Sequence, residues 1–269
     1  MQNIVYYPNL ALQPFIDHYR IWKYQIGTMD ESLFKDYPRT AMDMVFCLEG
    51  QLQLTVLHQS SITLAPFSFV GHFDKAYLIQ PKADITLVSI RFKSNGIYPL
   101  TKMPLQRFLN HHIELADLLG NSTLQLAEQL KNTISNHQKI QLLENYFSPI
   151  FLNSDLHYRL DGGVQMIQQC KGQITVKELS HQLNTNYKSL DRWFNKKIGL
   201  SPKRFIQLTR FKHILENIES TNQPNWMNLV VQHGFYDQAH FIKEFKQFAG
   251  ICPSEYVQEH IAFSRHFER

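Results

Sequence analysis

The sequence predicts a two-domain α+β fold, in which a helical connector joins a β-rich N-terminal domain to an all-α C-terminal domain. The 269 residues are too many for one minimal domain and suit two, because domains usually run about 100 to 200 residues. Segments of alternating hydrophobicity run from residue 19 to residue 92, and helical spacing of apolar residues follows them. We therefore expect domains over residues 1–104 and 163–262, with the connector and a linker over 105–162.

The expected strands lie in residues 19–92, where short apolar segments are separated by Gly, Pro, Asp and Ser. In the segment QLQLTVL at residues 51–57, apolar and polar side chains alternate. Such alternation places one face of a strand in a core and the other in water. The pattern predicts a β-sandwich or a small barrel.

The expected connector helices follow Pro104, where apolar residues recur at intervals of three and four through residues 105–153. This spacing predicts two or three amphipathic helices. Their apolar faces have three candidate partners, which are the β-rich domain, one another, or a second copy of the chain. His111 and His112 would point about 100° apart on such a helix, which argues against chelation by the pair. Residues 154–163 end in two glycines and form the predicted linker.

Composition excludes several classes of protein. Hydrophobic residues make up 43% and charged residues 19% of the chain, as in an ordinary globular protein. No stretch approaches the roughly 20 apolar residues of a membrane span, and the N-terminus lacks a signal-peptide pattern, so we expect a cytoplasmic protein with no membrane partner. The three cysteines are far apart and form no CxxC pair, which indicates reduced thiols rather than disulfides or a zinc site.

Positive charge is concentrated in the C-terminal part of the chain. Residues 163–269 carry 14 Lys and Arg against 9 Asp and Glu, whereas residues 1–162 carry 13 against 14. A positive excess confined to one domain is typical of nucleic-acid binding, because it attracts phosphates.

Two stretches of the C-terminal part repeat with an offset of 51 residues. They are NYKSLDRWFNKKIGLSPKRF and DQAHFIKEFKQFAGICPSEY, and their matched pairs are Leu190 and Phe241, Phe194 and Phe245, Gly199 and Gly250, Pro202 and Pro253, and Phe205 and Tyr256. Each stretch opens on a helix-capping residue, Asn186 or Asp237. Two large apolar residues four apart then mark the buried side of a helix, Gly ends that helix, and Pro begins the next one.

Each stretch follows a short predicted helix and a turn, with the sequence VKELSHQL in the first copy and WMNLVVQHG in the second. This order predicts two helix-turn-helix units, whose second helices enter the major groove of DNA. The segment PKRFIQLTRFKHILENI predicts a helix between them. A separation near one DNA turn, about 34 Å, would let the two units meet successive major grooves.

At these residues the chain resembles the AraC/XylS family of transcriptional regulators. The resemblance covers residues 164–256 and is strongest in GFYDQAHFIKEFKQFAGICPSEY, with its Gly-Phe, capping Asp, aromatic-x-x-x-Phe-Lys, Gly-x-x-Pro and Tyr. Arg210 fits the Arg that the family has on the connecting helix. The chain departs from the family at Ser180 and Val231, where a small Ala is usual, and at Val257, where an Arg is usual.

The resemblance implies which side chains contact bases. In the first unit these are Lys188, Asp191 and Arg192. A guanidinium such as that of Arg192 can donate two hydrogen bonds to guanine, and Asp191 either accepts from cytosine or orients Arg192. In the second unit the matching residues are Gln238 for adenine, Ala239 for a thymine methyl group and Lys243 for guanine or phosphate. Basic residues beside the first unit are expected to contact phosphates rather than form a merely solvated face, and these are Lys196, Lys197, Lys203 and Arg204.

The N-terminal domain more weakly resembles the cupin-like domain of some of these regulators, in FVGHFDKAYLIQPKADITLVSIRFKSNGIYPL. A metal-binding cupin needs a cluster of His with a Glu, and the domain offers only His58 and His72 as separated candidates. We therefore expect no metal and no cofactor. Aromatic side chains either line an apolar effector pocket or form ordinary core, and the effector is unknown. No catalytic constellation occurs in the sequence, so we expect no enzyme.

These observations predict a sequence-specific DNA-binding transcription regulator that responds to an effector through its N-terminal domain. The partners that this function implies are double-stranded DNA, RNA polymerase, a small-molecule effector and a second copy of the chain in a homodimer. Two alternatives stay open. One is a metal-binding cupin-type enzyme fused to a DNA-binding domain, and the other is an effector-independent module that dimerises through residues 105–153.

Overall fold

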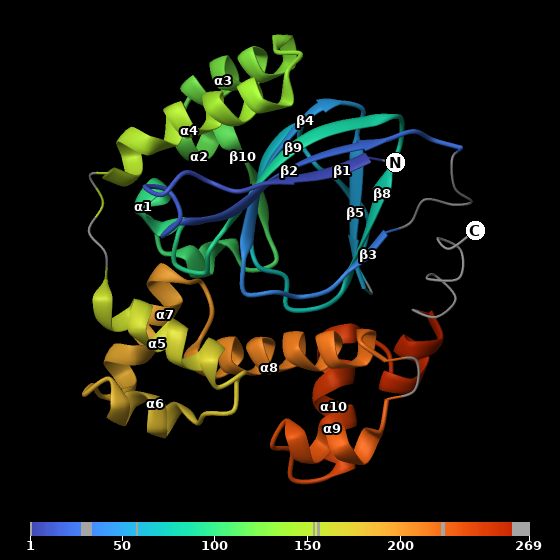
Figure 1. The fold of residues 1–269 in the computed structure, drawn as a ribbon, viewed down its shortest axis with the longest axis vertical. Coiled ribbons are helices and arrows are strands. Elements are labelled where there is room, and N and C mark those ends of the chain that lie inside the picture. The colour runs from blue at the N-terminus through green and yellow to red at the C-terminus, as the bar shows by residue number, and fades with distance from the viewer. Residues whose placement is uncertain are drawn as a thin grey trace.

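A strand-rich part and a helical part make up the computed structural model of the chain (Figure 1). The structure describes residues 2–27, 34–57, 59–152, 154, 157–221 and 224–259. In Figure 1 the strand-rich part lies above and the helical part below, so the two-domain α+β architecture is confirmed. Within the described residues, no helix combines the length and the apolar character needed to cross a membrane.

Antiparallel strands form two sheets in the described part of the chain. The larger sheet has the strand order β1 (Gln2–Tyr6), β2 (Ile16–Tyr24), β9 (Ile85–Phe92), β4 (Met42–Glu49), β7 (Phe67–Val70) and β10 (His112–Glu114). The smaller sheet has the order β3 (Phe34–Asp36), β8 (Tyr77–Pro81), β5 (Leu52–Val56) and β6 (Ile62–Thr63). The β-rich domain predicted from alternating hydrophobicity is therefore confirmed.

The larger sheet is buried on both faces, as strand β9 shows. Ile85 and Leu87 join a core shared with the smaller sheet, whereas Val88, Ile90 and Phe92 join the core on the opposite face. Successive side chains of a strand point to opposite faces. Two cores therefore explain why the apolar residues of this strand lie on both of its faces rather than at alternate positions only.

Helices cover the outer face of the larger sheet. They are α1 (Tyr98–Thr101), α2 (Leu115–Leu119), α3 (Ser122–Asn132) and α4 (Asn136–Leu152), and Figure 1 shows α3 and α4 side by side. Leu126 of α3 and Leu143 of α4 are buried in the same core as Phe92 of β9. Of the three partners that the sequence left open, the apolar faces of the connector use the β-rich domain and one another.

Residues 105–114 differ from the predicted helix. They form a 3-10 turn, η1 (Leu105–Phe108), followed by strand β10, which pairs with β7. The expectation that His111 and His112 lie on a helix was therefore wrong, because His112 opens this strand. The helix-like spacing arises because Leu105 and Phe108, three residues apart in the 3-10 turn, both point into the core.

The helical part begins with α5 (Tyr158–Gln169), earlier than the predicted boundary. The glycines assigned to a linker lie inside this helix, and Leu160 of its first turn is fully buried in the core of the helical part. A Cβ on Gly163 would stand 2.8 Å from Leu183 Cδ1. Gly163 therefore permits close packing of Leu183 against α5 and does not interrupt this helix.

Two helix-turn-helix units follow, as predicted. We call α6 (Val176–Gln182) with α7 (Tyr187–Lys197) the first unit, and α9 (Trp226–Gln232) with α10 (Gln238–Ala249) the second unit. The connecting helix α8 (Pro202–Glu219) lies between them, and a further helix covers residues 253–259. The repeated apolar residues meet in one core, where Leu190, Phe194, Phe205, Phe241, Phe245 and Tyr256 are almost completely buried.

Val231 of α9, where the sequence departs from the family, lies on the surface. Val231 is 75% exposed, whereas Val230 is 4% exposed and lies in the core. Val231 requires no repacking of the interior.

Candidate nucleic-acid interface

Side-chain caps lie at the N-termini of α7 and α10, where Asn186 and Asp237 are exposed. Asn186 Oδ1 accepts a hydrogen bond from the backbone N–H of Ser189 at 2.9 Å, and Asp237 Oδ1 accepts one from that of His240 at 2.7 Å. Each cap satisfies one N–H that lacks a partner within its helix. The first turn of a recognition helix is the part that meets base edges.

The first unit presents a line of cations. Lys188, Arg192 and Lys196 are exposed and lie four residues apart on α7, so they occupy one side of successive turns. Asp191 is half-buried beside Arg192. The predicted base-contact residues of this unit therefore lie together on the surface.

The second unit has a mixed polar surface. Gln238, Ala239 and Lys243 of α10 are exposed, while Phe241 and Phe245 between and beyond them face the core. The surface offers an amide, a methyl group and an ammonium group, which suit adenine, thymine and guanine edges in that order.

The four residues expected to contact phosphates lie in different surroundings. Lys196 and Lys203 are exposed, and Lys197 is half-buried with its Nζ 5.2 Å from the centre of the Tyr98 ring. Arg204 instead donates to the carbonyl oxygen of Asp74 at 2.8 Å, and its guanidinium lies 4.2 Å from the centre of the Phe248 ring. In this arrangement Arg204 is 18% exposed and joins the two domains.

The β7–β8 segment, residues 71–76, contacts the C-terminal ends of both recognition helices. His72 Nε2 lies 2.9 Å from the carbonyl oxygen of Ile198 at the end of α7, and the backbone N–H of Ala76 donates to the carbonyl oxygen of Phe248 in α10 at 2.8 Å. Terminal carbonyl groups of a helix have no partner within the helix. The β-rich domain therefore holds the two helices at their C-terminal ends and leaves their N-terminal turns free.

His72, a metal candidate in the sequence, is a buried link between the domains. Its ring nitrogens face two carbonyl oxygens, that of Ile198 and that of Arg39 at 3.1 Å. Burial lowers the pKa of His72 to about 4, although both carbonyls and the charge of Asp43 favour the protonated form. His58 lies outside the described residues, in which no group of three His, Cys, Asp or Glu is placed to hold a metal ion.

A buried ion pair fixes α10 on the connecting helix. Glu244 accepts hydrogen bonds from Arg210 Nε at 3.0 Å and from Gln207 Nε2 at 2.9 Å. Arg210 also lies over the ring of Phe235, 4.5 Å from its centre. The Arg expected from the family pattern therefore sets the position of the second recognition helix.

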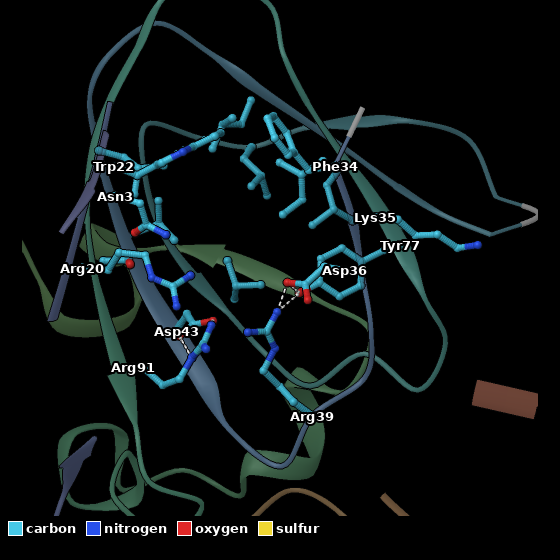
Figure 2. Close-up of a pocket in the computed structure, with 18 residues that line it drawn as sticks. Asn3, Arg20, Trp22, Phe34, Lys35, Asp36, Arg39, Asp43, Tyr77 and Arg91 are labelled. Atoms are coloured by element: carbon cyan, nitrogen blue, oxygen red, sulfur yellow. Dashed lines mark hydrogen bonds and ion pairs between the residues drawn. The ribbon is translucent and has the colours of Figure 1, made fainter. Parts of the chain in front are cut away.

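A cavity of about 320 Å³ lies between the two sheets (Figure 2). Aliphatic and aromatic side chains line one end, and Arg20, Arg39, Asp43 and Arg91 line the other. The sequence pattern suggested apolar residues for such a pocket and missed its charged end, because strand alternation does not tell which polar residues turn inward.

Known protein families match two parts of the chain. Residues 179–259 match a family described as a helix-turn-helix domain, and residues 4–114 match a domain of unknown function, DUF6597. The uncharacterized HTH-type transcriptional regulator YtdP of Bacillus subtilis is 24% identical over 172 residues, which are 59% of this chain and 22% of the relative. An uncharacterized HTH-type transcriptional regulator of Haemophilus influenzae is 25% identical over 93 residues, or 35% and 31% of the two chains.

Solved structures of regulators also align with the chain. ToxT from Vibrio cholerae aligns with a TM-score of 0.47 and 14% identity, covering 89% of this chain and 97% of that one. The AraC-like transcriptional activator CuxR aligns with a TM-score of 0.28 and 15% identity over 80% and 86%. This chain spans less than a third of the length of the two curated relatives it matches. The family match shows that the C-terminal part of the chain contains a helix-turn-helix domain, over residues 179–259.

Proposed function

We propose that the protein is a sequence-specific DNA-binding transcription regulator. The observation that carries the proposal is the pair of capped recognition helices, α7 and α10, with their N-terminal turns exposed. Both pack against the connecting helix α8, whose 18 residues span about 27 Å at 1.5 Å per residue. That length is of the same order as one turn of DNA, about 34 Å, which supports binding to successive major grooves.

Each exposed residue has a role in this proposal. Arg192 reads a guanine through two hydrogen bonds, with Lys188 and Asp191 at neighbouring bases. In the second unit, Gln238, Ala239 and Lys243 read the other half of the site. Lys196, Lys197 and Lys203 neutralise phosphates and set the position of the domain on the duplex.

The β-rich domain is proposed to make this regulator responsive to a small-molecule effector. Its support is the cavity between the sheets, together with the hydrogen bonds that the β7–β8 segment makes to both recognition helices. Such a regulator acts in the compartment that contains the DNA, through RNA polymerase, and is no enzyme in its own right. A homodimer through residues 105–153 has less support, because α3 and α4 bury their apolar residues within the chain.

Selection from a random duplex pool with the full chain tests the proposal. We expect enrichment of one site that spans two adjacent major grooves, and we expect Arg192→Ala to lose base preference at one position of it. Lys131→Ala removes one exposed charge from α3 and serves as the control. Equal binding to all sequences, released as the salt concentration rises, would show a merely electrostatic contact and would refute the proposal.

A further inference from the structure

The cavity between the two sheets has an apolar end. Its walls there come from both sheets, and Figure 2 shows Trp22 and Phe34 at this end of the cavity. The aliphatic residues that line the cavity are Val45, Leu52, Leu54, Leu64, Val70, Ile79 and Leu87. A volume of about 320 Å³ lies at the small end of the range for ligand pockets, roughly 300 to 1,000 Å³.

Two ion pairs account for most of the charge at the other end. Arg91 donates to both carboxylate oxygens of Asp43, at 2.9 and 3.0 Å. Arg39 forms an ion pair with Asp36, which also accepts a hydrogen bond from Tyr77 at 2.8 Å. Each of these two arginines therefore has a carboxylate of its own.

Arg20 is the third guanidinium of the cavity and has no carboxylate partner within ion-pair distance among the described residues. Its Nε is buried without a hydrogen-bond partner, and its terminal nitrogen lies 3.4 Å from His18 Nε2. Burial, and next the charge of Arg91, lower the pKa of Arg20. Lys35, the other cation of the lining, pairs with Glu259 at 2.9 Å. A guanidinium stays protonated in proteins, so Arg20 leaves one positive charge that no carboxylate balances. A buried charge without a partner is costly.

We propose that this cavity binds a small monocarboxylate with an apolar tail, whose carboxylate pairs with Arg20. The planar guanidinium matches a carboxylate in geometry, and its orphaned Nε supplies a directed donor. One surplus charge is balanced by a monoanion rather than by a dianion. The apolar end of the cavity then covers the tail, and burial of apolar surface favours binding.

The same cavity borders the contacts that hold the recognition helices. The carbonyl oxygen of Arg39 faces His72, which in turn faces Ile198 of α7. Tyr77, whose hydroxyl group binds Asp36, directly follows Ala76, which donates to Phe248 of α10. A ligand that shifts the ion pairs of Arg39 and Asp36 would therefore disturb residues next to both contacts with the recognition helices. This ligand class rests on the proposed function, since it names the effector of the same regulator.

The test is direct binding of octanoate to the full chain without DNA, by calorimetry and by the shift in melting temperature. Octanamide and octylamine have matched tails with a neutral and a positive head group. We expect octanoate to bind at least about tenfold more tightly than octanamide, as the loss of a charge-assisted hydrogen bond implies. Octylamine should not bind. Equal binding of octanoate and octanamide, or no binding of octanoate, overturns the proposal.

Variants locate the site. Arg20→Gln should remove the preference for octanoate over octanamide, while Arg107→Gln, an exposed Arg outside the cavity, should keep it. Val45→Phe fills the apolar end and should weaken both ligands, which supplies a second measurement if Arg20→Gln fails to fold. A preference that survives in Arg20→Gln overturns the proposal. DNA selection with the same protein decides the regulator proposal separately, because ligand binding is measured without DNA.

Discussion

In the proposed interface, some side chains are assigned to base recognition and others to attraction of phosphates. Lys203 is exposed at the start of α8 and is assigned to a phosphate. We expect Lys203→Ala to weaken binding equally for all duplexes and to reduce the slope of log affinity against log salt by about 1. Fluorescence anisotropy over a salt series measures both quantities. A change in base preference at unchanged slope would contradict the phosphate assignment.

His72 makes stability depend on pH. Its pKa falls from the ordinary 6.5 to about 4 on folding, so the unfolded chain binds the proton more readily. Native stability is therefore highest above pH 6.5 and decreases as the pH falls toward 4, by up to about 3 kcal/mol from this group. His72→Gln should show a smaller loss over this range in denaturant titrations, whereas His137→Gln, at an exposed position, should match the wild type. Identical pH profiles for the wild type and His72→Gln would exclude this role.

The residues that the sequence misjudged are those fixed by distant contacts. Arg204 looked like a phosphate ligand because it follows Lys203, yet its partner Asp74 is 130 residues away in the sequence. The charged wall of the cavity was missed for the same reason. That Arg192 and Lys243 are exposed was predictable, because helix periodicity alone decides which side chains turn outward.

Among the elements, the position of α10 on α8 depends on the pair formed by Arg210 and Glu244. Glu244→Ala leaves the half-buried Arg210 charge without its partner, so we expect a loss of about 2 to 3 kcal/mol of stability. Glu216→Ala removes an exposed carboxylate 3.6 Å from Lys212 and should cost less than about 1 kcal/mol. Urea unfolding of both variants measures the difference. Similar values for the two would show that the buried pair does not hold the helix.

Gly199 ends α7 where the helix meets the β-rich domain. Its φ of 91° favours glycine, and an added Cβ would stand 2.9 Å from the backbone oxygen of Leu105. We expect Gly199→Ala to lower stability by more than about 1 kcal/mol. Gly162→Ala, inside α5 with open space around it, should raise stability by about 0.5 to 1 kcal/mol. Thermal melts compare the stability of the two variants. An equal change in melting temperature for both would show that the close approach of Gly199 to Leu105 does not constrain the fold.

Elements with local signals were predictable. Caps, glycine stops and the 51-residue repeat fixed both helix-turn-helix units, because each signal acts within one or two turns. The boundary at residue 163 was misplaced, since paired glycines look like a linker until Leu183 is known to pack on one of them. The prediction of a helix at residues 105–114 was wrong because residues 112–114 pair with β7. Strand β7 is distant in the sequence, so the local pattern could not show this pairing.

At the scale of the whole molecule, the β7–β8 segment is one of the contacts between the β-rich domain and the helical domain. His72 and Ala76 contact the ends of α7 and α10, and Asp74 between them contacts Arg204 at the start of α8. The β-rich domain thereby holds both recognition helices and the helix that connects them. A change in the β-rich domain is therefore expected to affect both units together.

The two helix-turn-helix units of one chain are proposed to contact successive major grooves of the same duplex. Methylation footprinting at guanine N7 on the selected duplex tests it most directly, because N7 lies in the major groove. We predict protection in two grooves about 10 base pairs apart, with Arg192→Ala exposing the guanines of one groove and Lys243→Ala those of the other. Protection of a single groove, or loss of the same guanines in both variants, would contradict the account.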